Sequence, residues 1–272
     1  MKEAISQTSR KQRKLKSILR EMGSVLLAYS GGVDSTFLLK VALDCLGDKV
    51  MAVTARSETF PGSELSSSRK IAKSLGARHR VIRTKELASE KFASNPVNRC
   101  YFCKKELFSR LNDIAKREGF NFVADASNIS DKKDFRPGDK AKKELKIRSP
   151  LQEAGITKDE IRAMSRKLRL MTWDKPSLAC LASRIPYGTK ISVGSLARIN
   201  RAEMFLKGLG LRQVRLRHYD GACRIEVFKE EMPLVLKERD LIIERLKRMG
   251  YNTIALDLEG YRSGSMNEGL KR

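Results

Sequence analysis

The sequence predicts an α/β protein built on a doubly wound parallel sheet, with a smaller α/β domain in its C-terminal part. Three observations support this prediction. Short apolar runs typical of buried strands alternate with segments of helical periodicity through the first half of the chain. Glycines stand where several of these segments end. The length of 272 residues suggests two domains at about 150 residues each.

The first half alternates between strands and helices. A basic helix is predicted over residues 1–21, with an apolar stripe formed by Ile5, Leu15, Ile18 and Leu19. Strands are predicted where short runs are apolar or alternate in polarity, at residues 25–29, 50–54, 78–83 and 120–125. Helices are predicted where the apolar spacing is helical, at residues 36–43, 66–75 and 104–118.

After residue 130 the composition shifts. Residues 131–148 are highly charged and contain Pro137-Gly138, which predicts an exposed loop followed by a short strand. A helix is predicted over 157–168, with Thr157 and Glu160 as a capping box. Residues 178–195 are rich in Ser, Pro and Gly, and this composition predicts an active-site loop. The smaller α/β unit is predicted from helices at 193–209 and 234–249 and strands at 213–217, 222–228 and 253–258.

These elements predict three parts: the basic helix 1–21, the main sheet domain 22–172, and residues 173–272 with the loop and the small domain. Lys and Arg number 56 and Asp and Glu 32, so the formal net charge is +24. An apolar content of 41% excludes a wholly disordered basic chain. No apolar run approaches the roughly 20 residues of a membrane helix, and no secretory signal is evident, so we expect a cytoplasmic protein. The charge leaves nucleic acid and small anions open as partners.

A phosphate-binding loop is predicted between the first strand and the next helix. Its sequence is Ser30-Gly31-Gly32-Val33-Asp34-Ser35. The two glycines allow a tight turn, and the N–H groups that open the helix point at an anion. Ser30 and Ser35 add hydroxyl donors, and Asp34 is suited to orient the loop or to hold Mg²⁺. The lysine of the ordinary nucleotide P-loop is absent, which disfavours kinase-type or GTPase-type chemistry.

This segment resembles the PP-loop of the ATP pyrophosphatases, which cleave ATP between its α and β phosphates and transfer AMP to a substrate oxygen. The resemblance implies that the ends of the second and fourth strands face the nucleotide. Thr54 and Arg56 would lie there from the second strand, and Asp125 and Asn128 from the fourth. Asp125 and Asn128 are also typical of a turn that ends a strand, and this alternative stays open.

Three of the five cysteines are candidates for chemistry. Cys100 and Cys103 form a Cys-x-x-Cys motif, for which zinc, redox and structural interpretations compete. Cys180 is the third, and three thiolates suit a [4Fe–4S] cluster with one iron open. Cys45 and Cys223 lie in apolar surroundings and are predicted to be buried small side chains.

Blocks around Cys180 resemble the LarE-type ATP-dependent sulfur transferases within the PP-loop group. The matching blocks span most of the chain and are residues 134–138, 179–188, 214–218, 224–227 and 256–267. The resemblance implies ATP-dependent sulfur insertion into pyridinium-3,5-biscarboxylic acid mononucleotide, for the organic part of the nickel-pincer nucleotide. ATP and Mg²⁺ are the implied cofactors, and the implied assembly is a homo-oligomer, with a hexamer as the candidate.

Two branches of that family obtain sulfur differently. In one branch a single cysteine gives up its own sulfur, which here would make Cys180 the donor. In the other, three cysteines hold a [4Fe–4S] cluster that carries sulfide to the substrate. Because this sequence has all three cysteines, it favours the cluster branch, with Cys100, Cys103 and Cys180 as ligands.

The implied substrate carries a phosphate and two carboxylates, so cations are expected around it. Arg184, Arg215 and Arg217 lie in the matching blocks and can bind such anions through two nitrogens. Glu203 and Glu226 are candidates to orient these arginines or to bind substrate or metal. Ser183 is a further candidate catalytic residue, together with Cys180 and Arg184. In the tail, Arg262 and Ser263 are candidates to bind phosphate, and a simple turn is the alternative.

A cluster-dependent tRNA thiolase is the main alternative, because RNA phosphates would explain the charge of +24. However, Val33 stands where such thiolases carry Lys, and an aromatic content of 6% offers few surfaces for base stacking. An amide-forming synthetase would need an ammonia source that no part of the chain supplies. A non-enzymatic nucleotide-binding protein would release no pyrophosphate. We therefore expect nucleic acid not to be required.

Overall fold

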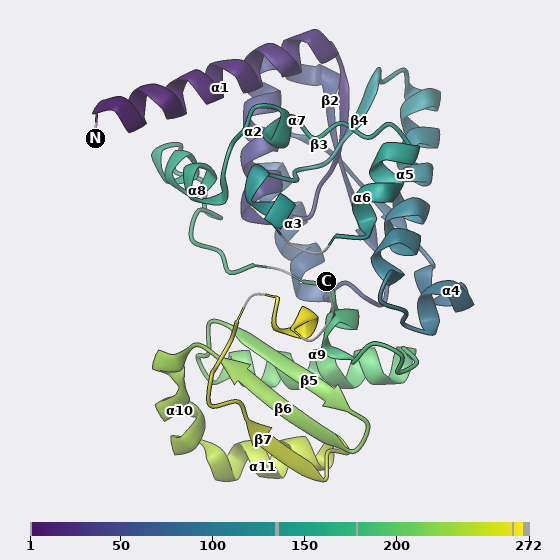
Figure 1. Ribbon diagram of the computed structural model, residues 1–272, viewed down its shortest axis with the longest axis vertical. Coiled ribbons are helices and arrows are strands. Elements are labelled where there is room, and N and C mark those ends of the chain that lie inside the picture. The colour runs from purple at the N-terminus through teal and green to yellow at the C-terminus, as the bar shows by residue number, and fades with distance from the viewer. Residues whose placement is uncertain (1, 134–135, 178, 263, 269–272) are drawn as a thin grey trace. The chain divides into compact units, whose positions relative to one another are not determined.

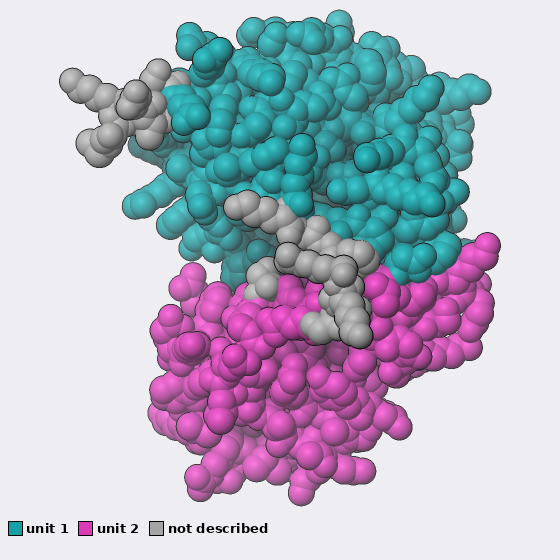
Figure 2. Space-filling view, viewed as in Figure 1, with its two compact units in different colours: residues 1–86, 98–178 teal, residues 87–97, 179–272 magenta. Residues whose placement is uncertain are grey.

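The computed structural model describes residues 2–133, 136–177, 179–262 and 264–268. The chain forms two compact units, coloured separately in Figure 2. Unit 1 contains residues 1–86 and 98–178, and unit 2 contains residues 87–97 and 179–272. The predicted division at 172/173 differs from this, mainly because residues 87–97 belong to unit 2. They do so through hydrogen bonds to residues 185–191, a long-range contact that leaves no local pattern in the sequence.

Unit 1 is built on a four-stranded sheet, which confirms the predicted fold class (Figure 1). Its strands are β1 (Val25–Ala28), β2 (Val50–Arg56), β3 (Arg78–Arg83) and β4 (Phe122–Ala124). All neighbours are parallel and the order is β3-β2-β1-β4. The order reverses at β1, because β2 and β3 lie on one side of it and β4 on the other. Ligands of open α/β sheets bind beyond the carboxyl ends of the strands at such a switch point.

Helices cover both faces of this sheet and create two apolar cores. Successive strand residues point to opposite faces. Leu27 therefore packs with one core, which includes Leu15 and Leu19 of helix α1 (Lys2–Met22). Leu26 packs with the other, which includes Phe108 of helix α5 (Arg99–Glu118). The predicted apolar stripe of the first helix is thus buried at all of its described side chains, while that of Ile5 lies outside the description.

The remaining helices of unit 1 complete these layers. They are α2 (Val33–Leu46), α3 (Gly62–Ser74), α6 (Gly138–Glu144), α7 (Pro150–Glu153) and α8 (Lys158–Lys167). Short 3₁₀ turns are η1 (Gly47–Lys49), η2 (Glu86–Ala88) and η3 (Ile129–Lys133). The capping box at Thr157 and Glu160 is confirmed.

The prediction for residues 131–148 is wrong in two respects. The segment contains helix α6, in which Ala141 and Lys142 are buried, so it is not an exposed loop. The predicted strand is reduced to a single parallel bridge between Arg148 and Ala124. The high charge conceals the helix, because the Lys142 ammonium is buried against Asp139 at 2.8 Å and Ser127 at 3.0 Å. Asp134 and Phe135, from the matching block, lie outside the described residues.

Unit 2 contains the smaller α/β arrangement. Strands β5 (Val214–Tyr219) and β6 (Ala222–Val227) are antiparallel, and β7 (Thr253–Leu256) runs parallel to β6. Helix α9 (Val193–Gly208) contacts β5. The single helix predicted over 234–249 is instead α10 (Met232–Lys237) and α11 (Arg239–Arg248). They are divided at Glu238, where the backbone angles change to φ −91° and ψ 15° with neither Gly nor Pro to signal the break.

Unit 2 also has α4 (Glu90–Ala93) and three 3₁₀ turns, η4 (Leu181–Arg184), η5 (Lys229–Glu231) and η6 (Ser265–Asn267). Of the helices that the structure describes, none has the length and apolar character needed to cross a membrane.

Candidate functional site

The predicted phosphate loop lies between β1 and α2, at the switch point of the sheet of unit 1. Gly31 has a φ of 70°, in the left-handed region that favours glycine. A Cβ at this position would lie 2.8 Å from the Cβ of Ser68 on α3. The loop therefore needs glycine for its backbone angle and for its close approach to α3.

The loop presents hydroxyl and amide groups of the kind that bind phosphate. The hydroxyls of Ser30 and Ser35 are 3.1 Å apart, and the Ser35 hydroxyl donates to the carbonyl of Gly32 at 3.3 Å. No side chain caps the start of α2, and the first-turn N–H groups of a helix have no acceptor within the helix. With the positive end of the helix dipole, this arrangement suits an anion.

Two lysines reach this loop from distant segments of unit 1. The Lys158 ammonium contacts both carboxylate oxygens of Asp34, at 2.7 and 2.8 Å. The Lys175 ammonium donates to the carbonyl of Gly31 at 3.2 Å and to Glu64 of α3 at 2.8 Å. Neither is predicted from the sequence, because more than 120 residues separate each lysine from its partner in the loop. The sequence signal that could have indicated a functional role for Lys175 is its position five residues before Cys180.

The end of β2 holds Thr54 and Arg56. Thr54 is buried, and its hydroxyl donates to the carbonyl of Tyr29 at 2.8 Å and lies 2.9 Å from Nε2 of His79. Arg56 is exposed. Burial lowers the pKa of His79, with a smaller contribution from the Arg69 charge. Thr54 thus joins β2 to its two neighbouring strands.

The end of β4 holds Asp125 and Asn128 in a hydrogen-bonded turn. Asp125 accepts from the hydroxyls of Ser127 at 2.6 Å and Ser149 at 2.7 Å. Burial alone would raise the pKa of Asp125, but the charges of Lys142 and Lys104 and the hydroxyl donors hold it below its usual value. Asn128 accepts from the N–H of Ser130 at 2.9 Å. Both side chains therefore have structural partners beside the switch point.

Cys100 and Cys103 lie on the first turn of α5, three residues apart and therefore on one side of the helix. Both are half-buried and neither is in a disulfide. The Cys103 thiol contacts Glu86 at 3.9 Å between Sγ and Oε1. Burial raises the pKa of Glu86, which also accepts from the Thr84 hydroxyl at 2.9 Å.

The other two cysteines of the sequence differ from these. Cys223 is buried, and burial raises the pKa of its thiol to about 12, as expected for a small core side chain. Cys45 is half-buried at the edge of the first core of unit 1. Burial also raises the pKa of Cys45, so neither thiol is readily ionised.

In unit 2, Cys180 is exposed and directly precedes η4, which ends at Arg184. Arg184 is buried and makes a two-point ion pair with Glu203, at 2.8 and 2.9 Å. Its remaining nitrogen donates to the carbonyl of Cys180 at 3.0 Å and to the hydroxyl of Ser183 at 2.9 Å. Burial would raise the pKa of Glu203, but Arg184 holds it below the usual value. The pair thus fixes the backbone that carries Cys180.

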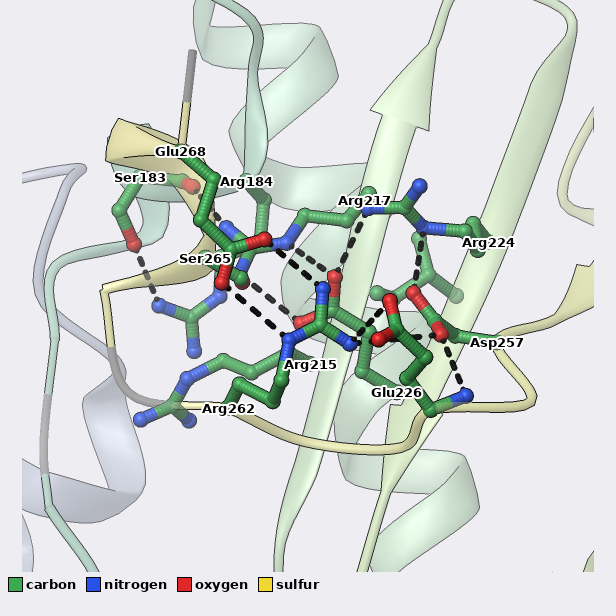
Figure 3. A network of polar contacts seen from close by, with 12 residues as sticks. Ser183, Arg184, Arg215, Arg217, Arg224, Glu226, Asp257, Arg262, Ser265 and Glu268 are labelled. Atoms are coloured by element: carbon green, nitrogen blue, oxygen red, sulfur yellow. Dashed lines mark hydrogen bonds and ion pairs between the residues drawn. The ribbon is translucent and has the colours of Figure 1, made fainter. Parts of the chain in front are cut away.

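Arg217 of β5 makes a second two-point pair, with Glu226 of β6 at 2.8 and 2.9 Å (Figure 3). The same guanidinium donates to the carbonyl of Ser183 at 2.6 Å and to the hydroxyl of Ser265 at 2.8 Å. It therefore joins residues 179–184, here named the Cys180 loop, to Ser265 in the tail of the chain within unit 2.

Arg215 precedes Arg217 by two residues, so both lie on one face of β5. Arg215 is buried, with its guanidinium 5.4 Å from the ring centre of Tyr261. Burial, followed by the charge of Arg184, lowers its pKa. The three predicted arginines of unit 2 thus lie near one another and near Ser183, as Figure 3 shows.

The tail residue Arg262 is engaged in ion pairs with Glu259 at 2.8 Å and Glu268 at 2.9 Å. The Tyr187 hydroxyl donates to Asn267 at 3.0 Å. Ser263, the other tail candidate, lies outside the described residues. Within the described part of either unit, no three His, Cys, Asp or Glu side chains are placed to hold a metal ion.

The strand order, the glycine loop after β1 and the smaller second unit define a protein of the PP-loop ATP pyrophosphatase class. No family model matches the chain. Over 263 residues it is 38% identical to the pyridinium-3,5-bisthiocarboxylic acid mononucleotide synthase of Lactiplantibacillus plantarum, covering 96% of this chain and 95% of that protein. The chain belongs to the LarE-type family of enzymes that this synthase represents, which confirms the resemblance drawn from the sequence.

Two uncharacterised proteins are also similar over nearly their full lengths. One, from Synechocystis, is 42% identical over 260 residues, covering 95% of this chain and 97% of that protein. The other, from Methanocaldococcus jannaschii, is 29% identical over 253 residues, covering 92% and 96%.

Proposed function

We propose that this protein inserts sulfur into pyridinium-3,5-biscarboxylic acid mononucleotide at the expense of ATP, for the nickel-pincer nucleotide. The observation that carries the proposal is the similarity to the Lactiplantibacillus synthase over both full lengths. The phosphate loop supports it independently, because activation of a carboxylate by ATP needs such a loop.

In the first step, a substrate carboxylate oxygen attacks the α-phosphorus of ATP. The bond to the β-phosphate breaks and pyrophosphate leaves with that electron pair. The Gly31 and Gly32 backbone and the hydroxyls of Ser30 and Ser35 bind the phosphates. The Asp34 carboxylate, which is paired with Lys158, would hold Mg²⁺, and the ion would neutralise charge on the phosphates. The adenosine part of ATP is assigned to four residues at the ends of β2 and β4: Thr54, Arg56, Asp125 and Asn128.

In the second step, a sulfur nucleophile attacks the carbonyl carbon of the acyl adenylate. AMP leaves with the electron pair of the broken carbon–oxygen bond, and a thiocarboxylate remains. Adenylation is required because a carboxylate oxygen is a poor leaving group, whereas AMP is a good one. Arg184, Arg215 and Arg217 supply positive charge for the substrate anions, and Glu203 and Glu226 orient two of these arginines. Ser183 steadies the loop that carries the nucleophile.

For sulfur delivery, we propose that the thiols of Cys100, Cys103 and Cys180 are the ligands of a cluster that carries the sulfide. Their soft sulfur donors fit a [4Fe–4S] cluster, which would supply an open iron that binds sulfide. The alternative is that Cys180 gives up its own sulfur. Iron and acid-labile sulfide after anaerobic purification and reconstitution distinguish the two. Cys45→Ser is the matched control for Cys100→Ser, Cys103→Ser and Cys180→Ser, and a wild-type protein without iron contradicts the cluster.

We further propose that the protein is cytoplasmic and forms a homo-oligomer, with a hexamer as the candidate assembly. The function is tested by pyrophosphate release from Mg²⁺–ATP in the presence of the pyridinium dicarboxylate mononucleotide. We expect release that depends on this substrate and persists in Cys180→Ser, because adenylation needs no thiol. Release that depends instead on tRNA would contradict the substrate, and no release with either would contradict the enzyme class.

A further inference from the structure

Asn95 is a buried residue with an unusual backbone, located between α4 and α5. Its φ is 57°, in the left-handed region, and its exposed fraction is 0%. Its side-chain amide donates to three backbone carbonyls of unit 2, those of Pro186 at 2.7 Å, Thr189 at 3.0 Å and Ile185 at 3.3 Å. Its own carbonyl accepts from the N–H of Gly188 at 2.9 Å. One residue thus holds both sides of the turn at 185–189.

The chemistry of this contact requires the asparagine amide. Asparagine tolerates a positive φ better than most residues, and its NH₂ group provides the donors that buried carbonyls need. A carboxylate in the same place would face three carbonyl oxygens without a donor. The N–H of Ile191 also donates to the carbonyl of Ala93 at 2.8 Å, which extends the same contact. We name residues 90–97 and 185–191, with these hydrogen bonds, the Asn95 clamp.

The two segments of the Asn95 clamp adjoin, along the chain, the segments that bear the proposed sulfur ligands. Cys100 follows Asn95 by five residues, and Ile185 follows Cys180 by five residues. Five residues of extended chain span at most about 18 Å, so neither cysteine can lie farther than that from its end of the clamp. Ile185 also follows Arg184 directly, and Arg184 holds the carbonyl of Cys180 at 3.0 Å.

We propose that Asn95 is a positioning residue for sulfur transfer. It fixes the turn that continues the Cys180 loop and ties it to the segment that leads into Cys100 and Cys103. This inference rests on the proposed function of the cysteines. The hydrogen bonds of the clamp lie within unit 2, whereas the phosphate loop lies in unit 1, so we expect ATP binding by that loop to be independent of the clamp.

The test uses the full-length protein and Asn95→Gly, which retains the positive φ and the backbone acceptor but removes three side-chain hydrogen bonds. Asn95→Asp is the second variant, because it keeps the size and removes the donors. Lys190→Ala is the matched control, since the exposed ion pair of Lys190 with Glu90 at 3.2 Å joins the same two segments. Three readouts are compared: hydrogen exchange of the Gly188 and Ile191 amides in the iron-free protein, iron content after reconstitution, and pyrophosphate release.

In Asn95→Gly we expect amide protection at Gly188 and Ile191 to fall at least about tenfold, because each lost hydrogen bond contributes to closing the clamp. Iron content and thiocarboxylate formation fall with it by a larger factor than pyrophosphate release, and Lys190→Ala behaves as the wild type. Unchanged protection and iron content in a folded variant would overturn the proposal. If neither variant folds, rapid exchange of the Gly188 amide in the wild type would overturn it. If the wild type binds no iron, the cluster hypothesis is refuted. Amide protection and thiocarboxylate formation then still test the positioning role of Asn95.

Discussion

Arg184 and Glu203 form a buried two-point ion pair, and the third guanidinium nitrogen of Arg184 holds the carbonyl of Cys180 at 3.0 Å. The pair therefore links the interior of unit 2 to the backbone of the proposed sulfur site. Removing one partner of a buried pair leaves the other charge uncompensated.

Glu203→Gln should accordingly lower the free energy of unfolding by about 3–5 kcal/mol. Urea denaturation measures this loss. Glu244→Gln is the control, because it removes an exposed pair with Arg248 on α11 and should cost about 0.5 kcal/mol or less. Equal stability of the two variants would show that the buried pair has no special structural role.

Gly31→Ala should weaken ATP binding by about tenfold or more, since it combines backbone strain of about 1–3 kcal/mol with a 2.8 Å contact to Ser68. Gly47→Ala provides the control: its φ is also positive, at 57°, but nothing lies within 4 Å of the added Cβ. It should lose about 1–3 kcal/mol of stability and retain its ATP affinity. Calorimetric titration with Mg²⁺–ATP measures both, and unchanged affinity in Gly31→Ala would refute the assigned loop.

Lys175→Met should also weaken ATP binding, because the ammonium ties the Gly31 carbonyl to Glu64 of α3. The expected loss is about tenfold, the effect of one to two charged hydrogen bonds. Lys40→Met is the matched control on α2, where Lys40 makes a partly exposed pair with Asp44. If both variants bind ATP like the wild type, Lys175 has no part in shaping the loop.

Stability should fall as the pH drops below about 6.5, the usual pKa of histidine. Burial lowers the pKa of both His79 and His218. Between the lowered pKa of the folded state and pH 6.5, the unfolded chain binds more protons than the folded one, so the free energy of unfolding rises with pH in that window. Below the folded-state pKa, the contribution of these histidines no longer changes with pH. The double variant His79→Gln/His218→Gln should have a flatter profile in urea denaturation from pH 5 to 8. A profile as steep as that of the wild type would assign the dependence to other groups.

Much of unit 1 is predictable from the sequence because its signals are local. The loop at Ser30 follows an apolar strand and precedes a helix, and the capping box of α8 lies within four residues. Helix α6 is missed because its buried lysine resembles a solvated residue. Lys175 and Asn95 could not be predicted, since their partners lie 144 and 90–94 residues away. Arg184 and Arg217 are predicted as candidate site residues, but their pairing with Glu203 and Glu226 depends on the packing of unit 2.

The most direct test of the central claim is the mass of the product from an anaerobic reaction with ATP, Mg²⁺, sulfide and the pyridinium dicarboxylate mononucleotide. We predict that sulfur replaces one oxygen of each carboxylate and that AMP and pyrophosphate form together with the product. A pyridinium substrate of unchanged mass, with tRNA acquiring sulfur under the same conditions, would contradict the account.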